Sequence, residues 1–253
     1  AILPVGSLLP WKRAKLARAM KPLWVALALA FAFGALAWVV QSGRSLVAPV
    51  GALVGAWLVF GAVADLWTRS GNVVAKKASR ALRLPRADWG RVVAHSGLGI
   101  TMFGIAAITA WQVEDIRVAR EGETFDVGAY EVTLVSVGRT EGPNYFSTTA
   151  EILVARNGRA EAMLFPEKRV YPVAGMPTTE AAIDNGVFRD LYLVIGDPQQ
   201  GGGWAVRTYI KPFANWIWAG AIIMALGGGL SLSDRRFRVA AGTRKTPQGV
   251  PAE

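Results

Sequence analysis

The chain has 253 residues, of which 52% are apolar and 10 are tryptophans, and its 28 Lys and Arg outnumber its 18 Asp and Glu. The apolar content and the positive mean hydropathy of +0.31 argue against an ordinary soluble globule. There is no cysteine, which excludes disulfides, thiolate metal sites and thiol nucleophiles. The net charge of +10 would suit a nucleic-acid-binding protein, so the positions of the charges decide its meaning.

Four runs without a formal charge predict four transmembrane helices, because a spanning helix needs about 20 mostly apolar residues. They are residues 22–43, 45–64, 92–113 and 212–233. The predicted organisation is a basic lead-in (1–21), two helices (22–64), a basic loop (65–91), a third helix (92–113), a segment of different character (114–211), a fourth helix (212–233) and a tail (234–253). Asp88, just after Pro85, is the expected N-cap of the third helix. Residues 73–84 form either a short interfacial helix or a plain loop.

The charges are divided unevenly between the two predicted sides of the membrane. Lead-in, basic loop and tail together carry 17 cations and four acids, whereas residues 114–211 carry 10 cations and 14 acids. Short loops rich in Lys and Arg stay in the cytoplasm. We therefore expect both ends of the chain to be cytoplasmic and residues 114–211 to be extracytoplasmic, and the positive surplus offers no nucleic-acid-binding face.

Two features suggest a piece of a longer protein. The chain begins at Ala1 with an apolar stretch, residues 2–9, that lacks the basic start of a signal peptide. Small residues recur at helical spacing within the spans, as at Gly51 and Gly55, which is typical of closely packed membrane helices. We expect further helices, either upstream in the same polypeptide or in a partner subunit.

Residues 114–211 change from helical periodicity to alternation, and Asn157-Gly158 between two alternating runs is a strong signal for a β-hairpin. The predicted strands are 125–127, 130–137, 149–155, 160–165, 169–173, 191–195 and 204–209. Six or seven short strands, with a Pro- and Gly-rich turn at 196–203, predict an all-β sandwich or barrel-like domain between the third and fourth helices.

The predicted β segment offers little for catalysis, because it has no His and no Cys. Its acids, such as Glu141, Glu151 and Glu161, are scattered along alternating strands and are interpreted as solvated. Gly201 to Gly203 lacks the following Lys-Ser/Thr and helix of a phosphate-binding loop. Four cations would either clamp a carboxylate or haem propionate or, the favoured interpretation, form surface ion pairs; they are Lys168, Arg169, Arg189 and Arg207. Docking is the simpler role for this domain.

His95, the one histidine of the chain, lies four residues into the third uncharged run, about 6 Å along a helix. A titratable group inside a membrane is a functional candidate. A neutral imidazole that bonds a carbonyl or a serine one turn away, or that lies close enough to the interface to reach water, is an equally good interpretation. Gly97 and Gly99 are expected to leave a flat surface beside the ring, and Arg91 is expected to reach a propionate. A haem ligated through the imidazole would fit such a surface, with its second ligand from elsewhere.

Several strings in a fixed order resemble the C-terminal part of the CcmF family (CcmF, CycK and NrfE) of cytochrome c-type biogenesis haem lyase subunits. They are GPNY at 142–145, FPEKRVYPV at 165–173, MPTTEAAID at 176–184, FRDLY at 188–192, WAVRTYIKPFANWIWAGAIIMALGG at 204–228 and SDRRFR at 233–238. The AHSG at 94–97 is similar to the family's second transmembrane histidine motif. The resemblance covers residues 89–238 closely and the first two spans only in pattern.

The resemblance implies a multi-pass subunit of a bacterial or mitochondrial inner membrane, with its β domain in the periplasm in bacteria. It implies a role in System I cytochrome c maturation, in which haem passes from a holo haem chaperone to apocytochrome c with the help of a thioredoxin-like apocytochrome-handling subunit. His95 carries over as one axial ligand to the iron of a transmembrane haem b.

The resemblance is incomplete, because the family's first transmembrane histidine, its two external histidines and its tryptophan-rich motif have no counterpart here. The fragment alone is therefore expected to be inactive as a haem lyase, that is, as a holocytochrome c synthase. It is expected to need the N-terminal half of the same protein or a partner subunit. A non-catalytic, membrane-anchored scaffold that recruits periplasmic partners through residues 171–184 stays open as the alternative. A transporter subunit is disfavoured, because the spans lack charged residues.

Overall fold

The computed structural model describes residues 2–9, 17, 20–43, 45–71 and 73–234. The lead-in cations Lys12, Arg13, Lys15 and Arg18, the turn residue Arg44 and the basic tail from Arg235 onward lie outside these residues. The chain divides into two compact units. One, the helical unit, comprises Ala1–Leu36, Val50–Phe103 and Trp218–Glu253, and the other comprises Ala37–Pro49 and Gly104–Ile217. The second unit holds the strands together with the adjoining ends of the helices.

Four long helices confirm the predicted spans, since each is long and apolar enough to cross a membrane. They are α3 (Trp24–Val40, preceded by the 3-10 turn η1, Lys21–Leu23), α4 (Val47–Arg69), α6 (Arg86–Trp111) and α7 (Ala214–Leu232). Three shorter elements are α1 (Leu3–Gly6), η2 (Val74–Lys76) and α5 (Lys77–Ala81). A short helix therefore occupies part of the segment for which helix and plain loop were both open.

The third span starts earlier than its uncharged run suggests, and the predicted N-cap is wrong. Helix α6 begins at Arg86, so Asp88 is its third residue. The carbonyl of Pro85 accepts hydrogen bonds from the backbone N–H groups of Asp88 and Trp89. The N–H of Ala87, which has no partner inside the helix, donates to the carboxylate of Asp234 at 3.0 Å. A carboxylate from the end of α7 thus performs the capping role expected of Asp88.

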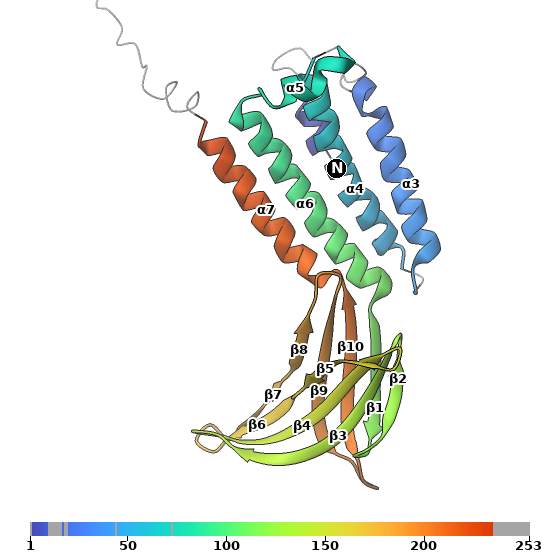
Figure 1. Ribbon diagram of the computed structural model, residues 1–253, viewed down its shortest axis with the longest axis vertical. Coiled ribbons are helices and arrows are strands. Elements are labelled where there is room, and N and C mark those ends of the chain that lie inside the picture. Colours follow the sequence, from blue (N-terminus) through green and yellow to red (C-terminus); the bar gives the residue numbers. More distant parts are fainter. Residues whose placement is uncertain (1, 10–16, 18–19, 44, 72, 235–253) are drawn as a thin grey trace, which may run out of the picture. The chain divides into compact units, whose positions relative to one another are not determined.

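In the helical unit, α6 lies between α4 and α7 (Figure 1), and glycines set its distance from both. A methyl group added to Gly97 would lie 2.6 Å from the carbonyl oxygen of Gly220, and one added to Gly220 would lie 2.5 Å from that of Gly97. Seven residues away on each helix, Gly90 of α6 and Gly227 of α7 approach each other in the same reciprocal way. Such contacts are typical of membrane helices that pack backbone against backbone.

The second unit contains ten antiparallel strands in two sheets (Figure 1). They are β1 (Val113–Ala119), β2 (Thr124–Val127), β3 (Tyr130–Glu141), β4 (Phe146–Arg156), β5 (Arg159–Leu164), β6 (Glu167–Tyr171), β7 (Met176–Glu180), β8 (Ala182–Asn185), β9 (Arg189–Pro198) and β10 (Trp204–Pro212). One sheet has the order β1-β10-β9-β8, and the other has the order β2-β3-β4-β6-β7, with β5 paired to β4. We call these strands the β domain, and they confirm the predicted β-sandwich between the third and fourth long helices.

The β4–β5 hairpin turns at Asn157 and Gly158 as predicted, with φ angles of 50° and 71° that suit a two-residue turn. The predicted strand count was too low, because β1, β7 and β8 were missed. β1 follows α6 after a single residue, Gln112, and lies almost entirely within the segment assigned to the β domain, but no strand was predicted there. β7 contains Pro177 and is an edge strand, which is where a strand tolerates proline.

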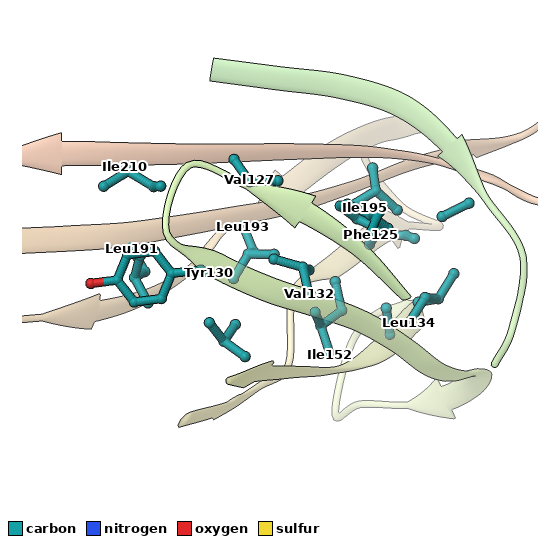
Figure 2. Close-up of a cluster of buried hydrophobic side chains, with 14 residues drawn as sticks. Phe125, Val127, Tyr130, Val132, Leu134, Ile152, Leu191, Leu193, Ile195 and Ile210 are labelled. Atoms are coloured by element: carbon teal, nitrogen blue, oxygen red, sulfur yellow. The ribbon is translucent and has the colours of Figure 1, made fainter. Parts of the chain in front are cut away.

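Fourteen buried residues form the core of the β domain, and Figure 2 shows ten of them labelled. Alternate residues of the central strands point inward, such as Leu191, Leu193 and Ile195 of β9, each with at most 1% of its surface exposed. Val132 and Leu134 of β3 and Ile152 of β4 meet them from the other sheet. Burial of such side chains is worth about 1.5–3 kcal/mol each.

The join between the last strand and α7 is fixed by hydrogen bonds within the second unit. The side-chain amide of Asn215 donates to the carbonyl of Gly186 and to the carboxylate of Asp190, both at 2.9 Å. The indole N–H of Trp216 donates to the carbonyl of Val187 at 2.9 Å. The first turn of α7 is therefore attached to the β8–β9 turn.

Candidate functional site

His95 lies deeper along its helix than its uncharged run suggested. It is the tenth residue of α6, so it lies about 14 Å from the start of the helix at 1.5 Å per residue, whereas the sequence had placed it about 6 Å inside. The ring is half-buried and lines a hollow of about 480 Å³. The other lining residues are Arg91 and, from α1 and its flanks, Ile2, Leu3, Gly6 and Ser7. Among the described residues no hydrogen bond to the imidazole is found, so the carbonyl- or serine-bonded histidine is not observed.

The expected glycine wall beside His95 is wrong. Gly97 packs against Gly220 and Met224 of α7, and Gly99 packs against Gly55 and Val59 of α4. Both glycines are buried. They serve the approach of the neighbouring helices, so their faces are not available to a ligand.

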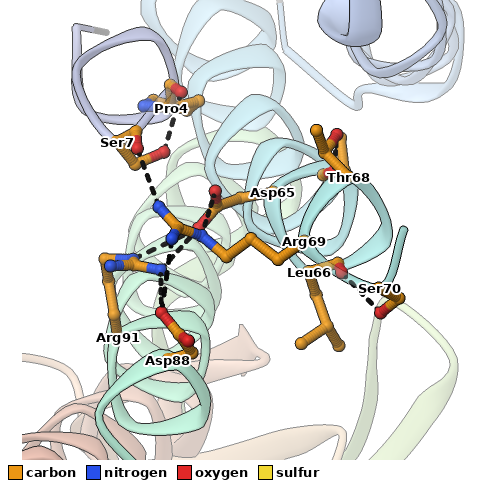
Figure 3. Close-up of polar contacts among 10 residues, drawn as sticks. Pro4, Ser7, Asp65, Leu66, Thr68, Arg69, Ser70, Asp88 and Arg91 are labelled. Atoms are coloured by element: carbon orange, nitrogen blue, oxygen red, sulfur yellow. Dashed lines mark hydrogen bonds and ion pairs between the residues drawn. The ribbon is translucent and has the colours of Figure 1, made fainter. Parts of the chain in front are cut away.

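Arg91 lies one turn before His95 and is held by two carboxylates, as Figure 3 shows. Its Nε donates to Oδ2 of Asp65 at 3.2 Å, and its Nη2 donates to Oδ1 of Asp88 at 2.9 Å. Arg69 bonds the same two acids, with its Nε 2.9 Å from Asp65 Oδ1 and its Nη1 3.4 Å from Asp88 Oδ1. A propionate at Arg91 would therefore have to compete with carboxylates already in place.

This cluster joins three elements of the helical unit. Only 3% of the Asp65 side chain is exposed, against 33% for Arg69 and 30% for Arg91. Arg69 also donates through Nη2 to the backbone carbonyl of Ser7 at 3.1 Å (Figure 3). Asp65 and Arg69 belong to α4, Asp88 and Arg91 to α6, and Ser7 follows α1. A carboxylate buried away from water needs positively charged partners, and Asp65 has two in Arg69 and Arg91.

The β-domain cations are confirmed as ordinary ion pairs in three of four cases. Lys168 pairs with Asp197, Arg169 with Glu167 at 2.8 Å, and Arg189 with Glu161 at 2.7 Å. Burial lowers the pKa of Arg189, but bonds to Asp184, Tyr130 and Glu161 outweigh it and raise the pKa overall. Arg207 is exposed and has no carboxylate within ion-pair distance among the described residues. The acids Glu141, Glu151 and Glu161 are exposed as predicted.

Comparison with known proteins gives a consistent set of relatives. A family profile described as "CcmF C-terminal beta-sandwich" matches residues 110–212. The cytochrome c-type biogenesis protein ccl1 of Rhodobacter capsulatus is 57% identical over 244 residues, which are 96% of this chain and 37% of that protein. The cytochrome c-type biogenesis protein CcmF of Escherichia coli is 37% identical over 252 residues, 98% of this chain and 38% of that protein.

The chain belongs to the CcmF/CycK/Ccl1 family. It corresponds to the C-terminal portion and spans little more than a third of the length of these relatives, 37% for ccl1. A solved structure, "Cytochrome c Heme Lyase CcmF", shares the fold, with a TM-score of 0.66 at 23% identity over 92% of this chain and 38% of that chain. The chain thus shares its four long apolar helices and its β-sandwich with a family whose members named above are cytochrome c-type biogenesis proteins.

The residues of this CcmF-type chain fit one axial bond to a haem iron. The imidazole of His95 faces a hollow with apolar neighbours in Ile2 and Leu3 and is not taken up by a hydrogen bond within the described residues. His95 is also the one histidine of this sequence, so any second imidazole ligand would have to come from residues outside it. No cluster of three His, Cys, Asp or Glu that suits a bare metal ion occurs in the described part.

The sequence interpretation missed the role of Asp65 in this CcmF-type chain. The acid was counted as one of the cytoplasmic charges, but it is the buried centre of the cluster around Arg91. A signal was present, because Asp65 and Arg69 are spaced i, i+4 and Asp88 and Arg91 i, i+3 on helices. The sequence alone does not show that the pair on α4 faces the pair on α6.

Proposed function

We propose that this chain is the C-terminal portion of a haem lyase subunit in cytochrome c maturation, and that His95 supplies one axial ligand to a b-type haem in the membrane. The observation that carries the proposal is a half-buried imidazole that faces a hollow and has no hydrogen bond to the described residues, within a chain 57% identical to ccl1 over 96% of its length. A bound haem would supply one-electron redox chemistry at that position.

The chain's own residues position that ligand. The cluster of Asp65, Arg69, Asp88 and Arg91 ties α4 to α6 one turn from His95, and Ser7 brings α1 to the same place. The glycine contacts with α7 fix the opposite face of α6. With α6 held on both sides, the backbone from which the imidazole of His95 extends is fixed relative to α4 and α7.

We further propose that the α5 end of the helical unit is cytoplasmic and that the β domain is periplasmic, because the Lys and Arg surplus lies in the lead-in, in the basic loop that contains α5, and in the tail of the sequence. In this orientation the β domain docks the periplasmic partners. These are the holo haem chaperone, the thioredoxin-like subunit and apocytochrome c. The N-terminal half of the same protein, or a partner subunit, supplies the second haem ligand.

The test is a reduced-minus-oxidised absorption spectrum of the chain co-purified with the N-terminal part of the protein. We expect a b-type spectrum that His95→Ala abolishes. His95→Gly should also lose it and regain it on addition of free imidazole, because the small ligand fills the space left by the ring. Thr109→Ala is the matched control. This exposed residue lies on the same helix, and its hydroxyl donates to the backbone carbonyl of Ile105 in that helix.

An unchanged spectrum in His95→Ala would reject axial ligation by this residue. If cytochrome c maturation also persisted in that variant, the scaffold alternative would be supported. The scaffold alternative predicts that changes within residues 171–184 abolish co-purification of the partner. This segment spans the end of β6, β7 and part of β8.

A further inference from the structure

An open groove in the β domain runs along outward-facing side chains of β9 and β10 and reaches β6 and β7 of the other sheet. Along β10, Val206, Thr208 and Ile210 point into the core, so the residues between them point outward. These outward residues, Arg207, Tyr209 and Lys211, line a hollow of about 760 Å³ together with Tyr192 of β9 and Lys168 of β6. Its size is that of a ligand-binding cleft.

A second hollow shares a lining residue with the first. It measures about 540 Å³ and is lined by residues of β3, β4 and β6, including Arg139, Phe146 and Val170. Lys168 lines both hollows. Phe146 and Val170 are cross-strand partners and are 55% and 43% exposed, which adds an apolar surface to this end. We call the two hollows together the cationic groove.

The charge of the groove is opposite to that of its domain. Residues 114–211 contain 14 acids and 10 cations, yet the two linings contain four cations, Arg139, Lys168, Arg207 and Lys211, against the two acids Glu141 and Asp197. Asp197 is already paired with Lys168. Arg207 has no carboxylate within ion-pair distance among the described residues. A local reversal of sign of this kind attracts an acidic partner and orients its approach.

Two tyrosine rings hold the ammonium group of Lys211 in the lining of the groove. The ammonium of Lys211 lies 4.6 Å from the ring centre of Tyr192 and 5.4 Å from that of Tyr209. The two rings meet edge to face at 6.0 Å. Cation–π contacts keep a lysine on a surface without neutralising it. Tyrosine and arginine are also the residues that carry much of the binding energy at protein interfaces.

We propose that the cationic groove binds an acidic, extended peptide segment of a partner protein. Two open hollows that share Lys168, with cations along their length and an apolar end at Phe146, match a chain segment better than a compact anion. The proposal rests on the docking role proposed for the β domain and adds where the partner sits and what chemistry it presents. It does not depend on haem binding at His95.

The probe is a fluorescein-labelled peptide of alternating Glu and Ala, added to the full chain in detergent micelles and followed by fluorescence anisotropy. We expect saturable binding that weakens as salt is raised. The double charge reversal Arg207→Glu with Lys211→Glu should weaken binding by about tenfold or more, because it replaces attraction by repulsion at the centre of the groove. A peptide of alternating Gln and Ala should not bind.

The matched control is Arg156→Glu with Arg159→Glu, which changes the net charge equally at the exposed β4–β5 turn and should leave binding within about twofold. Equal loss in both double variants, or no binding by the unaltered chain, would overturn the proposal. Displacement of the peptide by inorganic phosphate at equal concentration would also overturn it, in favour of a small-anion site. The b-type spectrum of the co-purified assembly should be the same in both variants, so failure here is distinct from failure of His95 ligation.

Discussion

The helical unit and the β domain achieve close packing in opposite ways. Where α6 meets α7, Gly97 lies against Gly220 and Gly90 against Gly227, so that backbone touches backbone and no methyl group fits between. In the β domain the space between the sheets is filled by large side chains such as Leu193 and Ile195, both fully buried. The comparison teaches that the helical contact is sensitive to added atoms, whereas the β-domain core is sensitive to removed ones.

The largest effect is expected from removing volume from the β domain. Leu193→Ala should destabilise this domain by about 2–5 kcal/mol, because the side chain is fully buried and the surrounding sheets cannot close over the cavity. The measurement is the midpoint of chemical unfolding followed by far-UV circular dichroism. Ile116→Ala is the control: it removes an aliphatic side chain that is 55% exposed and should cost much less. Similar losses in both variants would contradict a volume-filled core.

Adding a single methyl group tests the helical unit, where two neighbouring glycines of α7 give a matched pair. A Cβ at Gly227 would lie 2.4 Å from the backbone nitrogen of Ala94, whereas a Cβ at Gly228 meets nothing within 4 Å. Gly227→Ala should destabilise the packing of α7 on α6 by about 1–3 kcal/mol. Gly228→Ala should be neutral or stabilising by up to about 1 kcal/mol, because alanine is the better helix former.

Helix loss during titration with sodium dodecyl sulfate in mixed micelles measures both changes. An equal response of the two variants would mean that the helices are not held backbone to backbone at Gly227.

The smallest effect is expected at a surface ion pair, where neither kind of packing is at stake. The Arg117 guanidinium bonds the carboxylate of Asp115 through Nη2 at 2.7 Å, and this bond holds the pKa of Asp115 below its usual range. A carboxyl group whose folded pKa is depressed stabilises the fold above its unfolded pKa and loses that contribution as the pH falls through the folded value.

Asp115→Asn should therefore cost at most about 1 kcal/mol at neutral pH and nothing once the pH is well below about 4. The check is the difference in Tm of the β domain between the two proteins at each pH. A difference that grows toward low pH would have the wrong sign for this pair.

Elements that depend on the properties of neighbouring residues in the sequence were predictable. The uncharged runs predicted the existence of the four long helices, since a bilayer accepts few charges, although α4 and α6 extend beyond their runs. Asn157-Gly158 predicted the β4–β5 hairpin, since both residues tolerate positive φ. The start of α6 was not predictable in this way, because the partner of the Ala87 N–H is Asp234, far away in sequence. β7 was missed because Pro177 argues against a strand unless its edge position is known.

At the candidate site the residue type was predictable and its neighbours were not. A lone histidine in a membrane span stands out in any sequence, and His95 does line a hollow. The glycines two and four residues further along looked like part of the same site, but they belong to the contacts with α7 and α4. Which side of a helix meets which neighbour is a property of the tertiary structure. The cluster of Asp65 with Arg91 was missed for the same reason.

The joins between strand and helix in the second unit have a mechanical consequence. Gln112 alone separates α6 from β1, and Phe213 alone separates β10 from α7, where Asn215 and Trp216 anchor the first turn to the β8–β9 turn. Such short, bonded joins have no slack. A force applied to β1 or β10 would therefore act directly on the last turn of α6 or the first turn of α7.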